Sequence, residues 1–219
     1  MKFALYKGKK VEAEATLKGA VCQECDSEVI AKCGDINRHH WAHKRKNECY
    51  HSSNPETKWH RDWKNNFPLE WQEETLYDSE TGEKHVADIK TPNGLVVEFQ
   101  HSPIEKKEVS TRNTFYKNII WIVNGKRRKY DERNFGKGNS RLINQWGNTG
   151  KLVFFDFGER GLTYLKPNRS GDYKIGSTHK KDLIWWINYV SRWGNLSGKV
   201  NQRLIDGVKY GTGIRSDKL

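Results

Sequence analysis

The sequence of 219 residues lacks long hydrophobic runs and contains only four cysteines. Its apolar segments, such as 119–123, are far shorter than the roughly 20 residues that cross a membrane, so we expect no membrane-spanning helix. Residues 3–6 are apolar, but Lys7, Lys9 and Lys10 interrupt them before the core of a secretory signal can form. We therefore expect a cytoplasmic protein.

Four cysteines could form two disulfides, but without a secretory signal we expect a reducing compartment, where a Cys-x-x-Cys pair more often binds a metal. Zn²⁺ takes four nitrogen or sulfur ligands in a tetrahedron. The predicted ligands of a structural zinc are Cys22, Cys25, His43 and Cys49. Buried free thiols are the competing interpretation.

His40 is the alternative histidine ligand for this zinc. In an extended segment His40 and His43 face opposite sides, so we do not expect both to reach one ion. We assign no ligand role to Cys33 or His39.

Residues 2–17 alternate loosely and predict a short hairpin around Gly8. Residues 1–52 would then form a small β-rich module, whose core is too small to fold without a metal.

The net charge of +12 is unevenly distributed along the chain. It is +3 over residues 1–52, −3 over 53–125 and +12 over 126–219. An acidic centre beside a basic, aromatic-rich segment predicts a polyanionic partner, nucleic acid and in particular DNA. The alternative is that excess Lys and Arg only keep the protein soluble.

Two predicted strands around a Pro-Asn-Gly turn at 92–94 carry an oxygen-rich corner. Glu98 and Gln100 are two residues apart and share a face, and the turn folds Asp88 back toward them. The neighbouring residues are apolar, so the strands should be buried, and buried carboxylates must be paired or bind a metal. This pattern predicts a Mg²⁺ or Mn²⁺ site, although solvated strand residues are the simpler alternative.

A helix is predicted over residues 55–67, with Asn54 as its cap and Pro55 in its first turn. An apolar stripe recurs every four residues, at Trp59, Trp63 and Phe67. A polar stripe with the same spacing lies beside it, at Glu56, His60 and Lys64. The ordinary explanation of the polar stripe is a solvated helix face.

Further elements give the order αβββαβ and an α/β (α+β) fold class. They are strands near 69–77, 84–90 and 95–100, a helix near 103–117 and a strand at 119–124. Arg112 and Tyr116 share a helix face that could meet the acidic corner or a phosphate.

These motifs together resemble the competence protein CoiA-like family, whose members pair a zinc-type module with a nuclease domain of the PD-(D/E)xK class. The resemblance covers residues 1–125. The matching residues are Cys22, Cys25, His40-Trp-Ala-His43, Cys49, Glu56, His60, Lys64, Ala87-Asp88, Glu98-Phe-Gln100-x-Ser102, Arg112, Tyr116 and Ile119-Ile-Trp121.

The resemblance implies a restriction-endonuclease-like core in which Asp88 and Glu98 bind the catalytic metal and Glu56 completes or orients the site. His60 and Lys64 would position phosphate or water. Most nucleases of this class carry lysine where this chain has Gln100, and glutamine cannot supply a positive charge. We expect Lys64 to compensate; the alternative is that catalysis is weak or lost.

Residues 126–219 lie outside this resemblance. They begin with a basic run, Lys126, Arg127, Arg128 and Lys129, and predict strands at 151–155 and 161–165 and a helix at 182–193. In that helix Leu183, Trp186 and Val190 have core spacing. We expect this half of the chain to clamp nucleic acid.

The expected domains are a zinc module at 1–52, a nuclease core at 53–130 and a basic C-terminal region at 131–219. The predicted function is metal-dependent cleavage of DNA. A non-catalytic nucleic-acid-binding protein acting in DNA uptake, recombination or defence is the main alternative, and a zinc-stapled interaction domain is another. A homodimer is compatible with the sequence.

Overall fold

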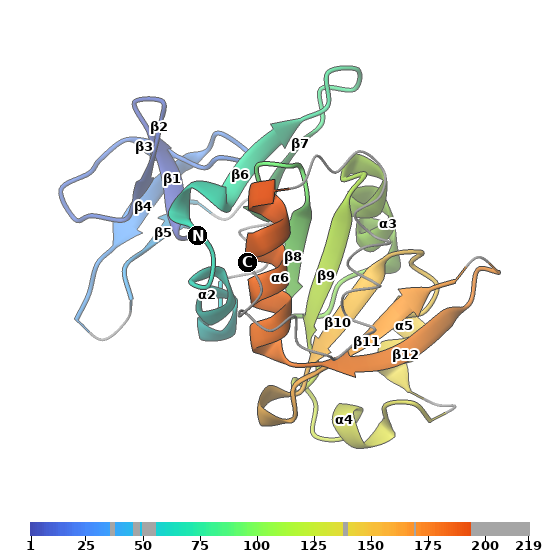
Figure 1. The fold of residues 1–219 in the computed structure, drawn as a ribbon. Helices are drawn as coiled ribbons and strands as arrows, with labels where there is room; N and C mark the ends of the chain where they lie inside the picture. The colour runs from blue at the N-terminus through green and yellow to red at the C-terminus, as the bar shows by residue number, and fades with distance from the viewer. Residues whose placement is uncertain (36–37, 46–48, 50–55, 138–139, 169, 194–219) are drawn as a thin grey trace. The chain divides into compact units, whose positions relative to one another are not determined.

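The computed structural model describes residues 1–35, 38–45, 49, 56–137, 140–168 and 170–193. The chain divides into two compact units, Met1–Ile89 and Lys90–Leu219. Five α-helices and twelve strands lie within the described residues (Figure 1), so the mixed α/β class expected from the sequence is confirmed. Among the described helices, none is long and apolar enough to cross a bilayer.

The first unit begins with an antiparallel sheet in the order β2-β1-β3-β4-β5. Its strands are β1 (Phe3–Tyr6), β2 (Lys9–Glu12), β3 (Ala20–Val21), β4 (Glu28–Lys32) and β5 (His40–His43). Lys7 and Gly8 both have positive φ, as the central residues of a tight type I′ turn require. The predicted hairpin around Gly8 is confirmed.

The core beside this sheet is small. It combines short side chains such as Ala4, Ala20 and Val29 with Trp41, whose indole N–H donates to the carbonyl of Val11 at 3.1 Å. A core of this size stabilises a module only weakly, so metal ligation would add the stability that it lacks.

Helix α2 (Lys58–Lys64) begins later than the sequence predicts. The expected cap Asn54 and the expected first-turn Pro55 lie outside the described residues. Thr57 caps the helix instead: its hydroxyl accepts from the backbone N–H of His60, and the His60 ring accepts from the backbone N–H of Thr57. This reciprocal capping box fixes where the helix starts.

Two strands follow α2, β6 (Gln72–Tyr77) and β7 (Lys84–Lys90), and they pair in antiparallel fashion. A 3₁₀ turn at Leu69–Trp71 replaces the first part of the predicted strand 69–77. Pro68, with its restricted φ, begins this turn. Of the predicted apolar stripe on α2, Trp63 is fully buried.

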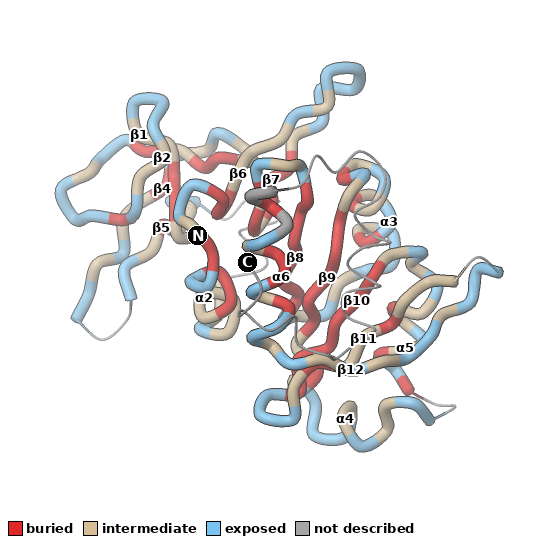
Figure 2. Tube along the Cα trace, in the orientation of Figure 1, coloured by how far each residue is buried: buried red, intermediate tan, exposed pale blue. Residues whose placement is uncertain are grey.

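The second unit contains β8 (Val96–Gln100), β9 (Ile119–Asn124), β10 (Leu152–Asp156), β11 (Leu162–Pro167) and β12 (Tyr173–Thr178). They follow the spatial order β12-β11-β10-β9-β8. Strand β9 pairs in parallel with both β8 and β10, and the other pairs are antiparallel. The three parallel strands are buried along nearly their whole length (Figure 2), as strands covered on both faces are.

The helices of the second unit are α3 (Lys106–Phe115), α4 (Asp131–Asn134), α5 (Arg141–Trp146) and α6 (Lys180–Trp193). Trp121 of β9 donates its indole N–H to Asn113 of α3 at 2.8 Å and packs 5.1 Å from the ring of Trp146 on α5. Helices α3 and α5 therefore cover one face of the strands. Figure 1 shows α6 on the viewer's side of β8 and β9.

Along the chain, α2, β6, β7, β8, α3 and β9 follow the predicted order αβββαβ. Strand β10 pairs directly with β9, so the expected boundary after residue 130 falls inside one continuous series of strands. The predicted elements at 151–155, 161–165 and 182–193 correspond to β10, β11 and α6. Leu183 and Trp186 are buried as predicted, whereas the side chain of Val190 lies outside the described residues.

Candidate functional site

The Cys-x-x-Cys turn and the end of β5 bring four potential metal ligands together. Cys22 and Cys25 lie on the turn between β3 and β4, where Asp26 has a positive φ of 57° and its N–H donates to the carbonyl of Cys22. The ligand atoms of Cys22, Cys25, His43 and Cys49 all lie within 4.8 Å of one another. The sulfurs of Cys22 and Cys49 are 3.9 Å apart, and Cys25 Sγ is 3.4 Å from His43 Nε2.

These spacings fit a tetrahedral metal. With Zn–S near 2.3 Å and Zn–N near 2.0 Å, the ligand atoms of a tetrahedral site are about 3.5–3.8 Å apart. The Cys22 thiol, burial and the Glu24 carboxylate raise the pKa of Cys49 well above its usual range, whereas a bound cation would favour the thiolate. The Cys₃His group could therefore bind a structural metal such as zinc.

His40 does not join this group. It lies at the other end of β5, three residues from His43, and its Nδ1 is 3.0 Å from the carbonyl of Arg38. The Cys33 thiol contacts the carbonyl of Ala13 at 3.6 Å. The alternation of strand side chains separates the two histidines, as the sequence predicts.

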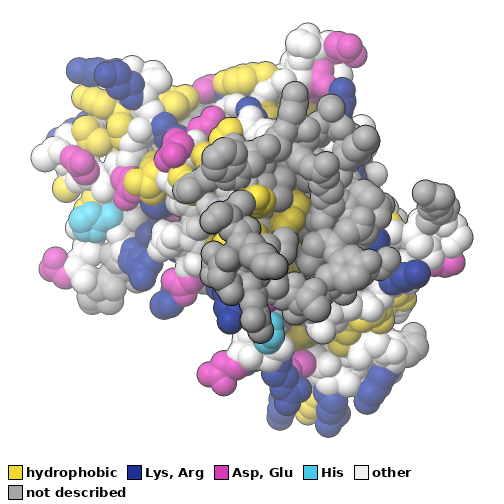
Figure 3. Space-filling view, in the orientation of Figure 1, with side chains coloured by type: hydrophobic (Ala, Val, Ile, Leu, Met, Phe, Trp, Pro, Cys, Tyr) yellow, Lys and Arg dark blue, Asp and Glu magenta, His cyan; other side chains and the backbone are white. Residues whose placement is uncertain are grey.

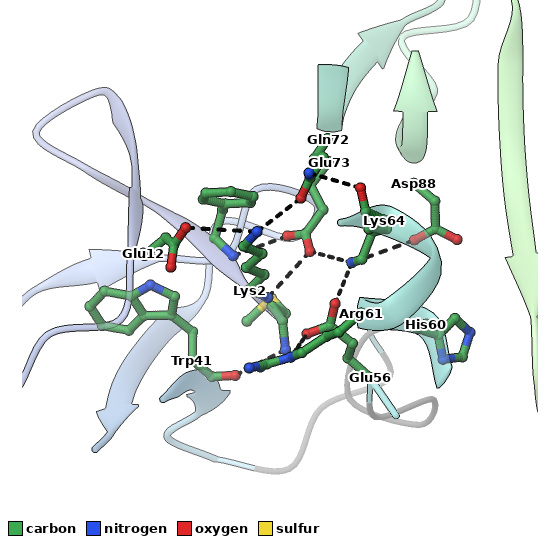
Figure 4. Close-up of polar contacts among 12 residues, drawn as sticks. Lys2, Glu12, Trp41, Glu56, His60, Arg61, Lys64, Gln72, Glu73 and Asp88 are labelled. Carbon is green, nitrogen blue, oxygen red and sulfur yellow. Dashed lines mark hydrogen bonds and ion pairs between the residues drawn. The ribbon is translucent and has the colours of Figure 1, made fainter. Parts of the chain in front are cut away.

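A second cluster in the same unit surrounds Lys64 of α2 (Figure 4). Its Nζ lies 2.5 Å from Glu56 Oε1, 2.6 Å from Glu73 Oε1 and 3.8 Å from Asp88 Oδ1. The Lys64 side chain is 3% exposed, whereas that of Asp88 is 21% exposed. The structure thus brings three of the predicted catalytic residues together, with Asp88 nearest to solvent.

Opposite charges in this cluster stabilise one another. Burial would lower the pKa of Lys64, but Glu73, Glu56 and Asp88 raise it well above its usual range, so the amine stays protonated. Burial opposes ionisation of Glu56, but Lys64, helped by Arg61 at 2.6 Å, holds the Glu56 pKa below its usual value. The Met1 amino group also interacts with Glu73 and Glu56, so three cationic groups surround the three carboxylates.

Glu73 is a member that the sequence analysis misses. The register of β6 and β7 places it across from Asp88, and its φ of 49° lies in the left-handed region. Such a conformation in a non-glycine residue costs of the order of 1–3 kcal/mol and is common at functional sites. Nothing in the strand pattern distinguishes buried Glu73 from its half-exposed neighbour Glu74, because the distinction arises from the local backbone.

His60 lies beside the cluster but binds the helix cap. Its Nδ1 accepts from the backbone N–H of Thr57 at 3.3 Å and lies 2.9 Å from the Thr57 hydroxyl. The neutral ring therefore carries its proton on Nε2. This contact gives His60 a structural role that the helical spacing alone does not predict.

In the second unit, Glu98 of β8 is buried with Arg112 of α3. Arg112 donates to Glu98 Oε2 at 3.0 Å and to Glu108 Oε1 at 2.7 Å. Arg112 therefore pairs with the carboxylate of Glu98, which is one of the two partners expected from the sequence. Arg112 and Tyr116 are each only 2% exposed. Their burial favours packing and the positioning of Glu98, and the phosphate contacts expected from the sequence stay a prediction.

Gln100 is also buried, and its amide nitrogen donates to the carbonyl of Ser102 at 2.8 Å. This bond fixes the orientation of the amide. The side chain carries no charge, so it cannot replace a lysine electrostatically.

The basic run at 126–129 is accessible. Lys126, Arg128 and Lys129 are exposed, and Arg127 is half-buried. Figure 3 shows Lys and Arg side chains gathered near α4. The ring of Tyr130 is exposed. Two cationic side chains lie over it, Lys129 at 5.5 Å and Arg133 at 4.9 Å from the ring centre.

Comparison with known proteins yields two matches in the order in which the two sites occur. Residues 5–52 match the N-terminal domain of competence protein CoiA, and residues 57–170 match its nuclease-like domain. No curated protein and no solved structure matches the chain. The nuclease-like match alone spans more than half of the sequence and includes Lys64, Asp88 and Glu98. The chain therefore belongs to the competence protein CoiA family.

Proposed function

We propose that the protein is a Mg²⁺- or Mn²⁺-dependent nuclease that hydrolyses phosphodiester bonds in DNA. The observation that carries this proposal is the buried Lys64 with Glu73 and Asp88 inside the nuclease-like match, joined by Glu56 directly before it. A lysine held in this way is a permanent positive charge next to a carboxylate that solvent can reach. That combination suits a site that handles phosphate and a cation together.

Asp88 and Glu98 are the proposed metal-binding carboxylates. The partial exposure of Asp88, which lies 3.8 Å from Lys64 Nζ rather than in a close ion pair, supports a cation there. A bound divalent ion would activate water and stabilise charge on the scissile phosphate. Arg112 fixes the position of the Glu98 carboxylate, and Glu56 fixes that of Lys64.

Lys64 would supply the charge that Gln100 does not. Because its pKa is raised, it neither accepts nor delivers a proton near neutral pH. Its proposed role is to supply a fixed positive charge beside Asp88 that acts on the phosphate without touching it, while Gln100 offers only hydrogen bonds. His60, with its proton on Nε2, could donate one further hydrogen bond to phosphate or water.

Nucleic acid would be held by the basic run at 126–129 and by cations of the region 131–219, which we propose as a clamp. Exposed Tyr130 next to Lys129 supports this, because aromatic rings and cations together bind bases and phosphates. Residues 1–52 would serve as a zinc-stabilised module of the same protein.

Incubation of the zinc-loaded full chain with linear, circular and single-stranded DNA tests the proposal. We expect cleavage that depends on Mg²⁺ or Mn²⁺, and a loss of about 100-fold or more in Asp88→Ala. Asp62→Ala is the matched control, because Asp62 pairs with Lys58 on the surface of α2, away from Lys64. Cleavage that persists in Asp88→Ala would place the site elsewhere.

A non-catalytic DNA-binding protein is the second candidate, and the uncharged, anchored Gln100 favours it. In that case the wild-type chain would bind all three DNA forms and cleave none of them with either metal. The same incubation, followed by a binding measurement, separates the two candidates.

A further inference from the structure

The carboxylate of Glu73 joins two parts of the first unit. Its Oε1 accepts from Lys64 Nζ at 2.6 Å and from the backbone N–H of Lys2 at 3.3 Å. Its Oε2 accepts from the backbone N–H of Phe3 at 3.1 Å. One buried side chain therefore binds both the start of β1 and the lysine of the proposed nuclease site.

The neighbouring Gln72 makes a parallel connection. Its Oε1 accepts from Lys2 Nζ at 3.0 Å, and its Nε2 donates to the carbonyl of Lys64 at 3.0 Å (Figure 4). Gln72 is almost fully buried. Two consecutive residues of β6 thus hold the same two segments together.

The start of β1 also contacts the Cys₃His group. Met1 Sδ lies 3.7 Å from Cys22 Sγ, and the carbonyl of Met1 accepts from the backbone N–H of Trp41 at 3.0 Å. A chain of direct contacts therefore runs from Cys22 through Met1 and the N–H groups of β1 to Glu73, and on to Lys64.

We propose that Glu73 is a positioning residue that holds Lys64 near Asp88 and couples it to the Cys₃His group. Metal at Cys22 would fix the segment 1–3, whose N–H groups fix the Glu73 carboxylate. The left-handed backbone of Glu73 supports this role, because surrounding contacts must maintain such a conformation. The catalytic consequence rests on the proposed nuclease function, whereas the structural coupling does not.

The test uses the zinc-loaded full chain labelled with ¹⁵N-lysine, in which the Nζ signal of Lys64 is assigned from its loss in Lys64→Met. Glu73→Gln should shift this signal, because an amide cannot accept from Phe3 and Lys64 with the same two atoms. Glu74→Gln is the matched control: Glu74 is the next residue of β6 and also pairs with the module, at Lys10, but it does not contact Lys64.

Removal of zinc with a chelator tests the coupling itself. It should shift the Lys64 signal in the wild type and in Glu74→Gln, and have little further effect in Glu73→Gln. A Lys64 signal that is unchanged in Glu73→Gln, or that responds to zinc removal equally in Glu73→Gln and wild type, would overturn the proposal.

Cleavage rates give the catalytic readout. With zinc retained and Mg²⁺ saturating, Glu73→Gln should cleave DNA about 100-fold more slowly, and the charge-retaining Glu73→Asp should recover part of the rate. A wild-type rate in Glu73→Gln would remove the positioning role.

If the wild type does not cleave DNA, the nuclease proposal fails, and the Lys64 signal still decides the coupling. If Glu73→Gln does not fold, Glu73→Asp takes its place. The Lys64 signal of zinc-loaded Glu73→Asp should then differ from that of the wild type, and an unshifted signal would count against the proposal.

Discussion

Lys64 is the residue on which the proposed chemistry depends. A buried amine is unfavourable unless carboxylates pair with it, and here three of them lie within 3.8 Å of Nζ. The result is a positive charge that persists at neutral pH. A site built in this way supplies electrostatic stabilisation but no acid or base, so proton transfer must come from other groups.

Replacement of individual histidines should show which of them is a zinc ligand. His43→Ala should abolish stoichiometric zinc binding and lower the melting temperature, because it removes one of four converging ligands. His40→Ala, the matched variant on the same strand, should retain zinc and stability. Metal analysis of the two purified proteins checks this, and zinc loss in His40→Ala alone would reverse the assignment.

The spacing of residues in the sequence predicts the surroundings of some site residues and not of others. Helical spacing puts Glu56 and Lys64 on one face but about 12 Å apart, and they form an ion pair because α2 begins only at Lys58, which leaves Glu56 outside the helix. The same spacing also predicts His60 beside them, but the ring turns to the Thr57 cap. Glu73 depends on a single unusual backbone angle, and no pattern in the sequence reports that angle.

Among the elements, the parallel strands of the second unit provide a rigid frame. Strand β9 is buried from Ile119 to Val123, and α3 and α5 meet at Trp121 on one of its faces. This frame holds β8, and with it Glu98 and Gln100, at fixed positions in the unit.

Two tryptophans allow a test of this packing. Trp146 of α5 is 1% exposed against Trp121, so Trp146→Ala should destabilise the protein by about 3–5 kcal/mol. Trp185 of α6 is 50% exposed and stacks only on Tyr189 among its described ring contacts, so Trp185→Ala should cost about 0.5 kcal/mol or less. Denaturant unfolding measures both, and equal costs would contradict the packing described for α5.

Elements with a strong apolar signal are predictable from this sequence. Strand β9 matches its predicted bounds of 119–124, because five consecutive large apolar residues leave little alternative. Helix α5 has only six residues and strand β12 is largely polar with a glycine, so neither shows a clear period. Tertiary contacts, rather than local preference, determine such elements.

For the whole molecule, the distribution of charge predicts how it should bind DNA. With a net charge of +12 in residues 126–219, affinity should fall about 10³–10⁵-fold between 50 and 200 mM salt if six to ten phosphates are contacted. Replacing Arg128 and Lys129 with glutamine should reduce the salt dependence, and the matched change of Lys106 and Lys107 on α3 should reduce it less. A flat salt response would exclude the electrostatic clamp.

The single-turnover rate of DNA cleavage by Lys64→Gln with saturating Mg²⁺ tests whether Lys64 supplies the positive charge of the proposed nuclease site. We predict a loss of about 100-fold or more, with Lys58→Gln, a surface change on the same helix, at the wild-type rate. Zinc content and melting temperature establish that each variant is folded. If Lys64→Gln is unstable, the double variant Lys64→Met/Glu56→Gln keeps the net charge of the cluster and takes its place. A folded variant without Lys64 that cleaves DNA at the wild-type rate would contradict this role of Lys64.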